Sequence, residues 1–508
     1  MKIIAKKIQK IWEYVNKNLI ISGIISGLIV LIVGGVIMLP KTTDPSGTKK
    51  QLARAQAFLD KGYTERAKEL FSQILQECGD NNHATTKAYV GRADVYLNQN
   101  KKDIERAIQD ANDAIKVNKN NGDAYHILGM AYSLKGEHEK AIENFNEALE
   151  RGTKRKENSY LHRGIEYSIL KDYDQSIANF NALLKIRPKS FEGLMYRCFA
   201  YEDKGEYDLA IADVTKVLKI DSYAGWYDLR GHLYERKGEY NLAIADFTTA
   251  IKMEPNEARY YTCRGLAYEE KGEYELAVAD FSKVLEIEPN NATYYHKRGH
   301  AYEKKGEYKL SIVNFAKAIE IEPNEARHYK CRGKMYSDKG EYDLAIADFT
   351  KVLEIEPNNA IYYDNRGHVY RDKGEYDLAI ADVTKALEIE PNNTEFYLCR
   401  ATTYYTNRKY ELAIADFTKA LEIEPNGAIY YYFRGLTYID KGEYDLAIAD
   451  FTKIAEIDPN NTELSHYVYR GILYMDKDKY DLAIADFTKA VKIKPNDVEL
   501  IINLLFSR

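Results

Sequence analysis

The sequence predicts an all-α fold, in which a solenoid (superhelix) of helical hairpins follows one transmembrane helix. One unit of sequence recurs every 34 residues, as the spacing of Gly265, Gly299 and Gly333 shows. Each unit contains two amphipathic stretches with apolar residues three or four positions apart. Residues 19–39 contain no charged side chain. Repeats of this length stack on one another, and the stacked array presents an extended binding surface.

Each unit predicts two helices joined by a tight turn. Gly272 marks the turn in one copy, because glycine adopts turn conformations that other residues resist. Gly265 and Ala277 are small at the places where the two antiparallel helices must approach each other. Pro289 ends the second helix. Neighbouring copies cover the apolar face that one hairpin leaves exposed, so we expect one elongated array.

The skeleton of the unit resembles the tetratricopeptide repeat. In one copy the matching residues are Gly265, Tyr268, Ala277, Phe281 and Pro289. Tyr261 stands where the family often has Trp, and Arg264 stands where it often has Leu. The pattern recurs in about 13 units over residues 48–497. The resemblance implies a solenoid in which the first helices of the pairs line a concave groove that takes peptides or protein segments.

An arginine precedes the small residue of the first helix in most copies, and an aspartate follows 16 residues later. Because both positions lie about equally far from the turn, we expect the two side chains to face each other across the hairpin. We interpret the pairs as partly buried structural contacts, in preference to a ligand-binding ladder. In one copy the partner of Arg298 is Asn314. The other pairs are Arg230/Asp246, Arg264/Asp280, Arg332/Asp348, Arg366/Asp382, Arg400/Asp416, Arg434/Asp450 and Arg470/Asp486.

The first helices also carry candidate binding residues, if the family geometry applies. These positions flank the arginine and glycine of the skeleton, and they vary between copies while the skeleton stays fixed. Such variation is typical of a specific surface on a shared frame, and it is also typical of unselected solvent-facing positions. The candidates are His232, Glu269, His296, His300, Glu303, Lys330, Lys334, Asp364, His368, Arg371, Thr402 and Tyr405.

The sequence contains no recognisable catalytic or cofactor-binding motif. It has no phosphate-binding glycine loop and no nucleophile elbow, and the repeats occupy nearly all of the chain. His296 and His300 lie four residues apart, a spacing that can chelate a metal on one helix face. No third ligand is evident beside them. We therefore predict no catalytic residue, no metal and no cofactor.

Charge and cysteine content limit the kind of partner. The net charge is −6. Residues 1–18 carry five lysines against one glutamate, or +4, which leaves −10 for the rest of the chain. A mildly acidic array disfavours nucleic acid, which needs a basic surface. Cys263, Cys331 and Cys399 occupy the same place in alternate repeats, too far apart for disulfides, and we interpret them as packing residues.

Residues 19–39 form a candidate transmembrane helix that Pro40 ends. At about 1.5 Å per residue this stretch spans a bilayer core of about 30 Å. A cleaved signal peptide is the alternative, but its apolar core is normally shorter, about 7–15 residues. A short lysine-rich tail is hard to translocate, so we favour a cytoplasmic N-terminus with the repeats outside, in a periplasm or an equivalent space. The unpaired cysteines favour the opposite orientation.

Shorter segments complete the predicted organisation. Residues 1–18 are a basic segment that either lies on an anionic membrane surface or serves only as an orientation signal. Residues 40–47 are a linker, and residues 498–508 a C-terminal capping helix. Gly23 and Gly27 place small residues on one face of the membrane helix, which can let two copies approach as a homodimer.

Two functions from different classes are consistent with these features. The first is a membrane-anchored scaffold or adaptor that binds partner segments in the groove of the solenoid. The second is a self-associating structural spacer or coat protein, in which repeats of different molecules stack on one another.

Overall fold

The computed structural model describes residues 45–78, 81–99, 103–457 and 465–493. These residues form 26 helices and no strand. Consecutive helices pack as pairs, and each pair packs on the next within its unit. The 26 described helices form 13 pairs, and this arrangement confirms the predicted all-α solenoid of helical hairpins. The chain divides into two compact units, Met1–Pro255 and Asn256–Arg508.

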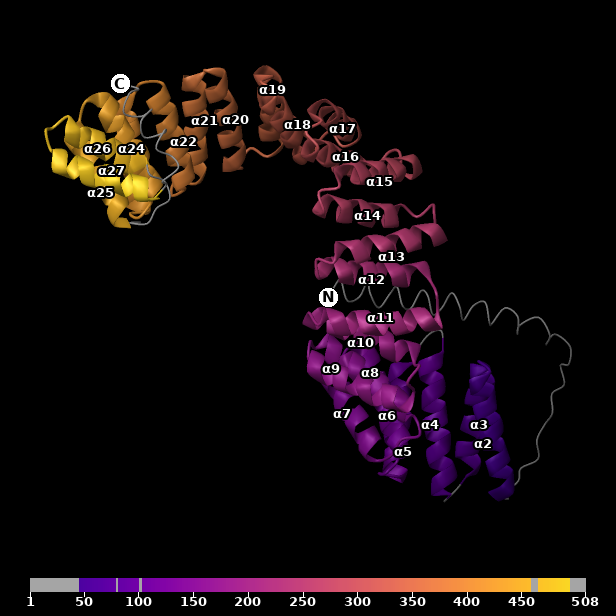
Figure 1. Ribbon diagram of the computed structural model, residues 1–508. Coiled ribbons are helices and arrows are strands. Elements are labelled where there is room, and N and C mark those ends of the chain that lie inside the picture. Colours follow the sequence, from indigo (N-terminus) through magenta and orange to yellow (C-terminus); the bar gives the residue numbers. More distant parts are fainter. Residues whose placement is uncertain (1–44, 79–80, 100–102, 458–464, 494–508) are drawn as a thin grey trace. The chain divides into compact units, whose positions relative to one another are not determined.

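The first unit contains six helix pairs, drawn in indigo to magenta in Figure 1. Its helices are α2 (Pro45–Asp60), α3 (Thr64–Glu77), α4 (Asn82–Asn98), α5 (Ile104–Val117), α6 (Gly122–Lys135), α7 (His138–Glu150), α8 (Lys156–Ile169), α9 (Tyr173–Ile186), α10 (Phe191–Lys204), α11 (Tyr207–Ile220), α12 (Ala224–Arg236) and α13 (Tyr240–Met253).

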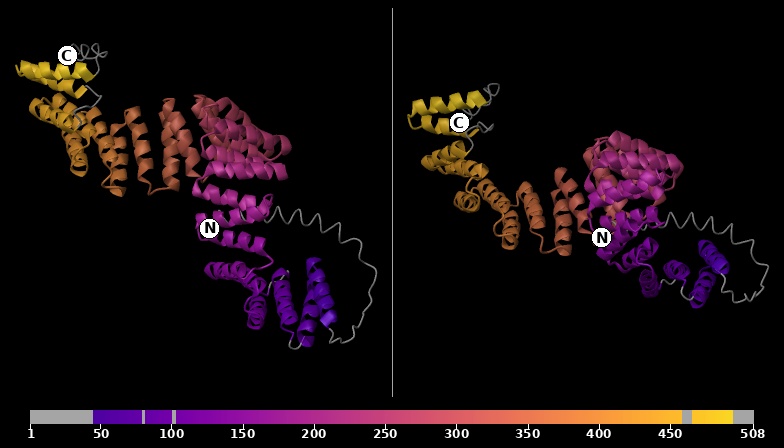
Figure 2. Two further views of the ribbon diagram at one scale, coloured as in Figure 1. Left: turned by 60° about the horizontal axis from the view of Figure 1, so that its bottom comes forward. Right: turned by 90° about the horizontal axis from the view of Figure 1, so that it is seen from below.

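The second unit contains seven pairs, and within it successive pairs stack side by side in both views of Figure 2. Its helices are α14 (Ala258–Glu270), α15 (Tyr274–Ile287), α16 (Ala292–Lys304), α17 (Tyr308–Ile321), α18 (Ala326–Asp338), α19 (Tyr342–Ile355), α20 (Ala360–Lys373), α21 (Tyr376–Ile389), α22 (Thr394–Thr406), α23 (Tyr410–Ile423), α24 (Ala428–Lys441), α25 (Tyr444–Ile457), α26 (Ser465–Met475) and α27 (Tyr480–Ile493).

The turn inside each hairpin depends on a left-handed residue wherever the turn itself is described. Gly272 adopts φ +75°, a conformation that costs glycine little because it has no Cβ. Arg408 and Asp478 stand at the same turn in other copies and adopt φ 56° and 57° without being glycine. The turn geometry is therefore kept even where the sequence does not favour it. After the second helix, Pro289 follows its C-terminal residues and Asn291 accepts a hydrogen bond from Thr293 N at 3.1 Å to begin the next helix.

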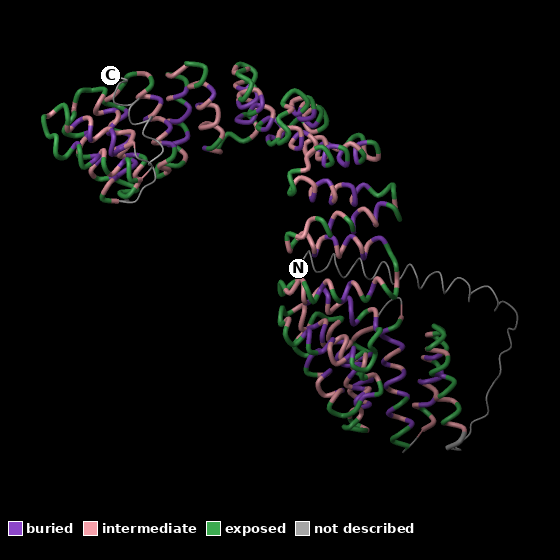
Figure 3. Tube along the Cα trace, viewed as in Figure 1, coloured by how far each residue is buried: buried purple, intermediate pink, exposed green. Residues whose placement is uncertain are grey.

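The core lies between the two helices of each pair and between neighbouring pairs, as the purple stretches of Figure 3 show. Phe281 is fully buried, and its ring lies over Gly265 of the first helix. A Cβ at Gly265 would lie only 2.9 Å from the Phe281 ring. The small residue of the skeleton therefore makes room for the large one, which is why the two positions recur together.

The predicted arginine–aspartate pairs are present, and most of their arginines also contact the preceding repeat. Arg366 donates from Nε and Nη2 to the two carboxylate oxygens of Asp382, at 2.7 and 2.8 Å. Its third donor, Nη1, reaches Thr350 Oγ1 on the second helix of the preceding repeat at 2.9 Å. The exception Arg298 bonds Asn314 in its own repeat and Ser282 in the preceding one. Arg230, Arg400, Arg434 and Arg470 make the same kind of contact, so these arginines link two repeats. Arg332 pairs with Asp348, and Ala316 stands where the preceding repeat would supply the hydroxyl.

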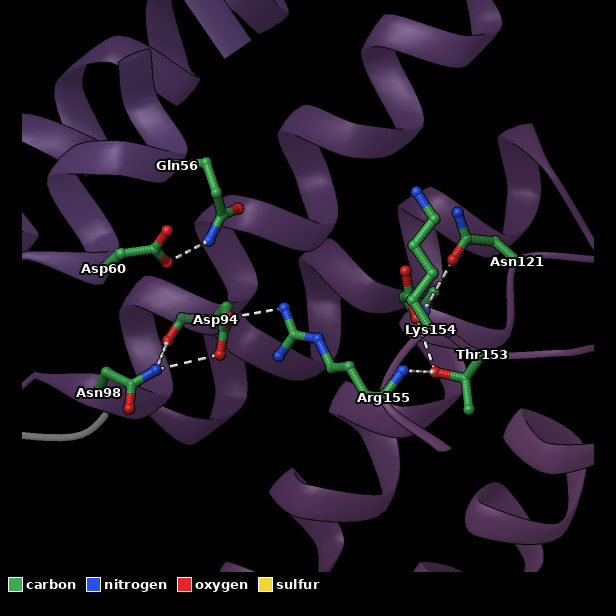
Figure 4. A network of polar contacts seen from close by, with 10 residues as sticks. Gln56, Asp60, Asp94, Asn98, Asn121, Thr153, Lys154 and Arg155 are labelled. Carbon is green, nitrogen blue, oxygen red and sulfur yellow. Dashed lines mark hydrogen bonds and ion pairs between the residues drawn. The ribbon is translucent and has the colours of Figure 1, made fainter. Parts of the chain in front are cut away.

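A different polar contact ties together the early repeats of the first unit. Arg155 precedes α8 and donates to Asp94 of α4 at 2.7 Å, although the two residues are 61 positions apart (Figure 4). Asn98, one turn along α4, donates to the same aspartate at 3.0 Å. The backbone N–H of Arg155 is held by Thr153 Oγ1 at 3.0 Å. The loop between α7 and α8 is therefore anchored two repeats away.

Only a few residues of the predicted segments at the two ends of the chain are described by the structure. Helix α2 begins at Pro45, so residues 45–47 belong to a helix and not to the predicted linker. The basic segment 1–18, the predicted membrane helix 19–39, its Gly23/Gly27 face and the predicted capping helix 498–508 lie outside the described residues. Among the residues that are described, no helix combines the length and the apolar character that crossing a membrane requires.

Candidate functional site

The predicted binding residues lie on first helices of the hairpins. His232 is on α12 in the first unit, where it contacts Glu235 of its own helix at 2.7 Å. The other eleven are in the second unit, on α14, α16, α18, α20 and α22. The structure brings several of these together across neighbouring first helices, and it adds partners that the sequence did not suggest.

Glu303 connects α16 to α18. Its Oε1 accepts from Lys334 Nζ at 2.8 Å, and its Oε2 contacts His300 Nδ1 at 3.0 Å. These partners lower the pKa of Glu303 to about 2, with the hydrogen bond from His300 as the largest cause. Three of the predicted residues therefore form one contact network. On the same face, Lys330 is exposed, and burial raises the pKa of Glu269 on α14.

Two further histidines meet behind this network. His296 Nδ1 lies 2.9 Å from His328 Nδ1, and His328 Nε2 lies 3.2 Å from Glu322 Oε2. Burial lowers the pKa of His296 to about 3, so this ring is neutral at neutral pH. The rings of His296 and His300 are 4.7 Å apart between centroids. His328 is fully buried and does not belong to the predicted set.

Cys331 of α18 completes this group. Its Sγ lies 3.7 Å from His300 Nε2, and ligand atoms of His296, His300 and Cys331 all lie within 4.8 Å of one another. No third ligand is evident from the sequence beside His296 and His300, because Cys331 comes from the next repeat. The signal that identifies it is a spacing of 31 residues from His300 to Cys331, which recurs from His368 to Cys399.

The recurrence two repeats further on has a similar geometry with different residues. His368 Nε2 lies 3.4 Å from Asp364 Oδ2, and Cys399 Sγ lies 3.5 Å from His368 Nε2. Asp364 Oδ1 is buried and has no hydrogen-bond partner. Burial and the Asp364 carboxylate raise the pKa of Cys399. Asp364 stands where the first group has His296, and Phe396 stands where it has His328.

The remaining predicted residues make simpler contacts. Tyr405 donates to Asp440 of α24 at 2.6 Å, which connects two more first helices. The hydroxyl of Thr402 donates to the carbonyl of Cys399 in its own helix at 2.9 Å. Arg371 lies 3.4 Å from its chain neighbour Asp372. These contacts leave the side chains in half-buried positions on the same series of helices.

The side chains on the first helices of the second unit offer two kinds of contact. Lysines, carboxylates and a tyrosine hydroxyl provide polar groups at repeat spacing, which suits an extended peptide or protein segment. The imidazole and thiol groups are ligands that suit a transition metal.

Family models for the tetratricopeptide repeat match several stretches of the chain. A model described as TPR repeat matches residues 231–272, 269–306 and 367–407. Models described as tetratricopeptide repeat match residues 398–462, then 326–359 and 466–497, and also 122–151, 157–190 and 292–325. A comparison with curated proteins finds no match.

Several solved structures are similar to parts of this chain. A structure described as MamA is 28% identical, covering 33% of this chain and 96% of that one, with a TM-score of 0.30. A tetratricopeptide repeat protein from Parabacteroides merdae ATCC 43184 is 22% identical, covering 49% and 98%, with a TM-score of 0.37. YrrB, described as a TPR protein with an unusual peptide-binding site, is 23% identical, covering 36% and 95%, with a TM-score of 0.32. The repeat skeleton, the helix pairs and the family models together show that this chain contains tetratricopeptide repeats.

Proposed function

We propose that this protein is a scaffold that binds segments of partner proteins along the first helices of its repeats. The observation that carries the proposal is the series of polar contacts between consecutive first helices of the second unit. Glu303 with Lys334 joins α16 to α18, and Tyr405 with Asp440 joins α22 to α24. The contacting residues differ from copy to copy, although the helices that carry them are alike. A partner segment lying across these helices would meet a different set of groups at each repeat.

The charges on this face indicate the kind of segment that fits. Lys330 and Lys334 are exposed one helical turn apart on α18. A segment with a carboxylate at the corresponding place would gain an ion pair with either amine. Surface pairs contribute about 0–1 kcal/mol each, so affinity must come from several repeats together.

The test is partner capture on the full-length protein with matched charge reversals. The test variant carries Lys330→Glu and Lys334→Glu on a first helix. The control variant carries Lys351→Glu and Lys385→Glu on second helices α19 and α21, where these lysines pair with Glu354 and Glu388 of their own helices. We expect the test variant to lose a specifically retained partner and the control to keep it. Equal retention by both variants, or loss by both, would refute a site on the first helices.

The membrane anchor is part of the same proposal. We infer that residues 19–39 hold the repeats at a membrane, with the N-terminus in the cytoplasm and the array outside. An uncharged stretch of this length supports the proposal, as does the lysine-rich tail before it. Protease treatment of intact cells, permeabilised cells and inverted vesicles tests the orientation. Cleavage of the repeats only in inverted vesicles would place the array in the cytoplasm instead.

One observation favours self-association as a second candidate function. A leucine on each second helix of the second unit is 45–49% exposed, and these leucines recur at nearly constant spacing. They are Leu276, Leu310, Leu344, Leu378, Leu412, Leu446 and Leu482. A regular apolar row can pair with the same row of a second molecule. Sedimentation of the full-length protein over a range of concentrations distinguishes the two functions. Association that Leu344→Lys with Leu378→Lys abolishes would support self-association, and a concentration-independent monomer would exclude it.

A further inference from the structure

His296, His300 and Cys331 lie close together, and hydrogen bonds around them also determine which nitrogen of each imidazole ring carries the proton. Each neutral histidine has one N–H and one lone pair, and a partner on one nitrogen decides which nitrogen keeps the lone pair. The partner of His300 Nδ1 is the carboxylate of Glu303. The partner of His296 Nδ1 is His328, which is itself hydrogen-bonded to the carboxylate of Glu322.

Glu303 fixes His300 directly. A carboxylate accepts hydrogen bonds, so the contact between His300 Nδ1 and Glu303 Oε2 at 3.0 Å requires a proton on Nδ1. When His300 is neutral, its lone pair is therefore on Nε2. This is the nitrogen that lies 3.7 Å from Cys331 Sγ.

Glu322 fixes His296 through His328. The carboxylate of Glu322 takes the N–H of His328 Nε2, which leaves the lone pair of His328 on Nδ1. That lone pair lies 2.9 Å from His296 Nδ1, which must then carry the proton of His296. The lone pair of His296 is consequently on Nε2 as well. Two separate carboxylates thus leave the Nε2 atoms of both histidines free to bind a metal ion.

We propose that His296, His300 and Cys331 form a zinc-type transition-metal site that bridges the first helices of two neighbouring repeats. Two imidazoles and a thiolate are a ligand set that zinc accepts, with the fourth tetrahedral position left for water or for a group of a partner. Ligands around a tetrahedral zinc lie roughly 3.5 Å apart, given metal–ligand distances of about 2.0–2.3 Å. The distance of 3.7 Å between His300 Nε2 and Cys331 Sγ is close to this value, and one ligand atom from each of the three residues lies within 4.8 Å of the other two.

The outer partners match those of established metal sites. Ligating histidines almost always donate their other N–H to a carboxylate, a carbonyl or water, which orients the ring. Glu303 does so for His300, and the His328–Glu322 pair does so for His296. Thiolate and imidazole ligands exclude magnesium and calcium as the preferred ions. The metal would displace the Cys331 proton and any proton on His300 Nε2.

The group two repeats along serves as an internal comparison. Asp364 replaces His296, and Phe396 and Arg371 replace the outer partners His328 and Glu303. Without the outer partners the ring of His368 is not fixed in the same way. We therefore expect Asp364, His368 and Cys399 to need a higher metal concentration than the proposed site.

The experiment is a cobalt titration of the full-length protein in detergent, reduced and stripped of metal. The first equivalent of Co²⁺ should produce a thiolate-to-cobalt charge-transfer band and the strong visible bands of tetrahedral cobalt, and Zn²⁺ should remove both. Cys331→Ser should abolish the charge-transfer band of this first equivalent, and His300→Ala should abolish the tetrahedral bands. Cys399→Ser, the matched control, should leave both unchanged. Far-UV circular dichroism shows that each variant is folded.

A fourth variant tests the role of the outer partner. Glu303→Gln keeps an acceptor for His300 but removes the charge, so we expect the same bands with an affinity about 10–100-fold weaker. The proposal is overturned if the wild-type protein gives no charge-transfer band. It is also overturned if the band of the first equivalent persists in folded Cys331→Ser, or disappears in Cys399→Ser instead.

Discussion

Arg366 holds Asp382 of its own repeat and Thr350 of the preceding repeat at the same time, through three separate N–H donors. The side chain of Asp382 is 10% exposed and that of Arg366 is 17% exposed. The pair is therefore shielded from solvent, and the free energy of this contact differs from that of a surface ion pair.

Breaking this pair from one side should cost more than removing both partners. Arg366→Ala leaves a buried carboxylate without its counter-ion, and we expect a loss of about 3–5 kcal/mol in the free energy of unfolding. Arg366→Ala combined with Asp382→Ala should lose less than the sum of the single changes. Urea unfolding of the four proteins in a double-mutant cycle measures this coupling, and strictly additive losses would contradict it.

The bond between repeats should be separable from the pair. Thr350→Val removes the acceptor of Arg366 Nη1 and keeps the size of the side chain, so we expect a loss of about 1–3 kcal/mol, as for a hydrogen bond to a charged group. Thr488 is the control, because among the described residues it donates to the carbonyl of Ile484 in its own helix and contacts no arginine. Urea unfolding should show a clear loss for Thr350→Val and almost none for Thr488→Val.

His162 should make the first unit sensitive to acid. Burial lowers its pKa from the ordinary 6.5 to about 4, and its ring stacks on Phe145 at 6.1 Å between centroids. Below pH 6.5 the unfolded chain takes up a proton that the folded chain refuses. Stability is therefore fully present above pH 6.5 and falls as the pH drops toward 4, by about 2 kcal/mol between pH 7 and pH 5 for this residue.

The change His162→Phe tests this effect, since it preserves the stacked ring and removes the titrating group. We expect the difference between the urea midpoints at pH 7 and pH 5 to shrink in the variant. His126 also has a lowered pKa because of burial, so some acid sensitivity should remain. An unchanged pH difference would show that His162 is not the group responsible.

Alanine at the small position of the skeleton should have unequal effects. In Gly164→Ala the new Cβ would lie 2.6 Å from the Phe180 ring, which is fully buried. We expect a loss of about 1–3 kcal/mol from overpacking. In Gly333→Ala the nearest atom is 3.1 Å away, and the gain in helix propensity of about 1 kcal/mol should offset the strain. Thermal unfolding of both variants tests the contrast, which equal losses would contradict.

The repeat skeleton and the arginine–aspartate pairs could be predicted because both lie within one hairpin. Arg366 and Asp382 lie about equally far from the turn, so they face each other across the hairpin regardless of how the neighbouring repeats are packed. The bond to Thr350 could not be predicted in this way, since it depends on how one hairpin is rotated against the previous one.

The candidate site shows the same division between local and neighbouring contacts. His296 and His300 share a helix face, and their spacing alone indicates it. Cys331 and His328 lie on the next first helix. They are separated from His300 in sequence by more residues than the pattern of a single helix covers. The repeated spacing from His300 to Cys331 and from His368 to Cys399 was the available signal.

The arginine that reaches backwards also bears on how such a chain can grow. Arg298, Arg366, Arg400 and Arg434 need only a hydroxyl at one position of the preceding copy, and a threonine or serine there supplies it. A duplicated copy inserted between two others therefore receives the contact it needs and provides the one its neighbour needs. Among copies that carry this hydroxyl the junction is interchangeable, so the length of the array can change there by whole units without a change in the contacts between repeats.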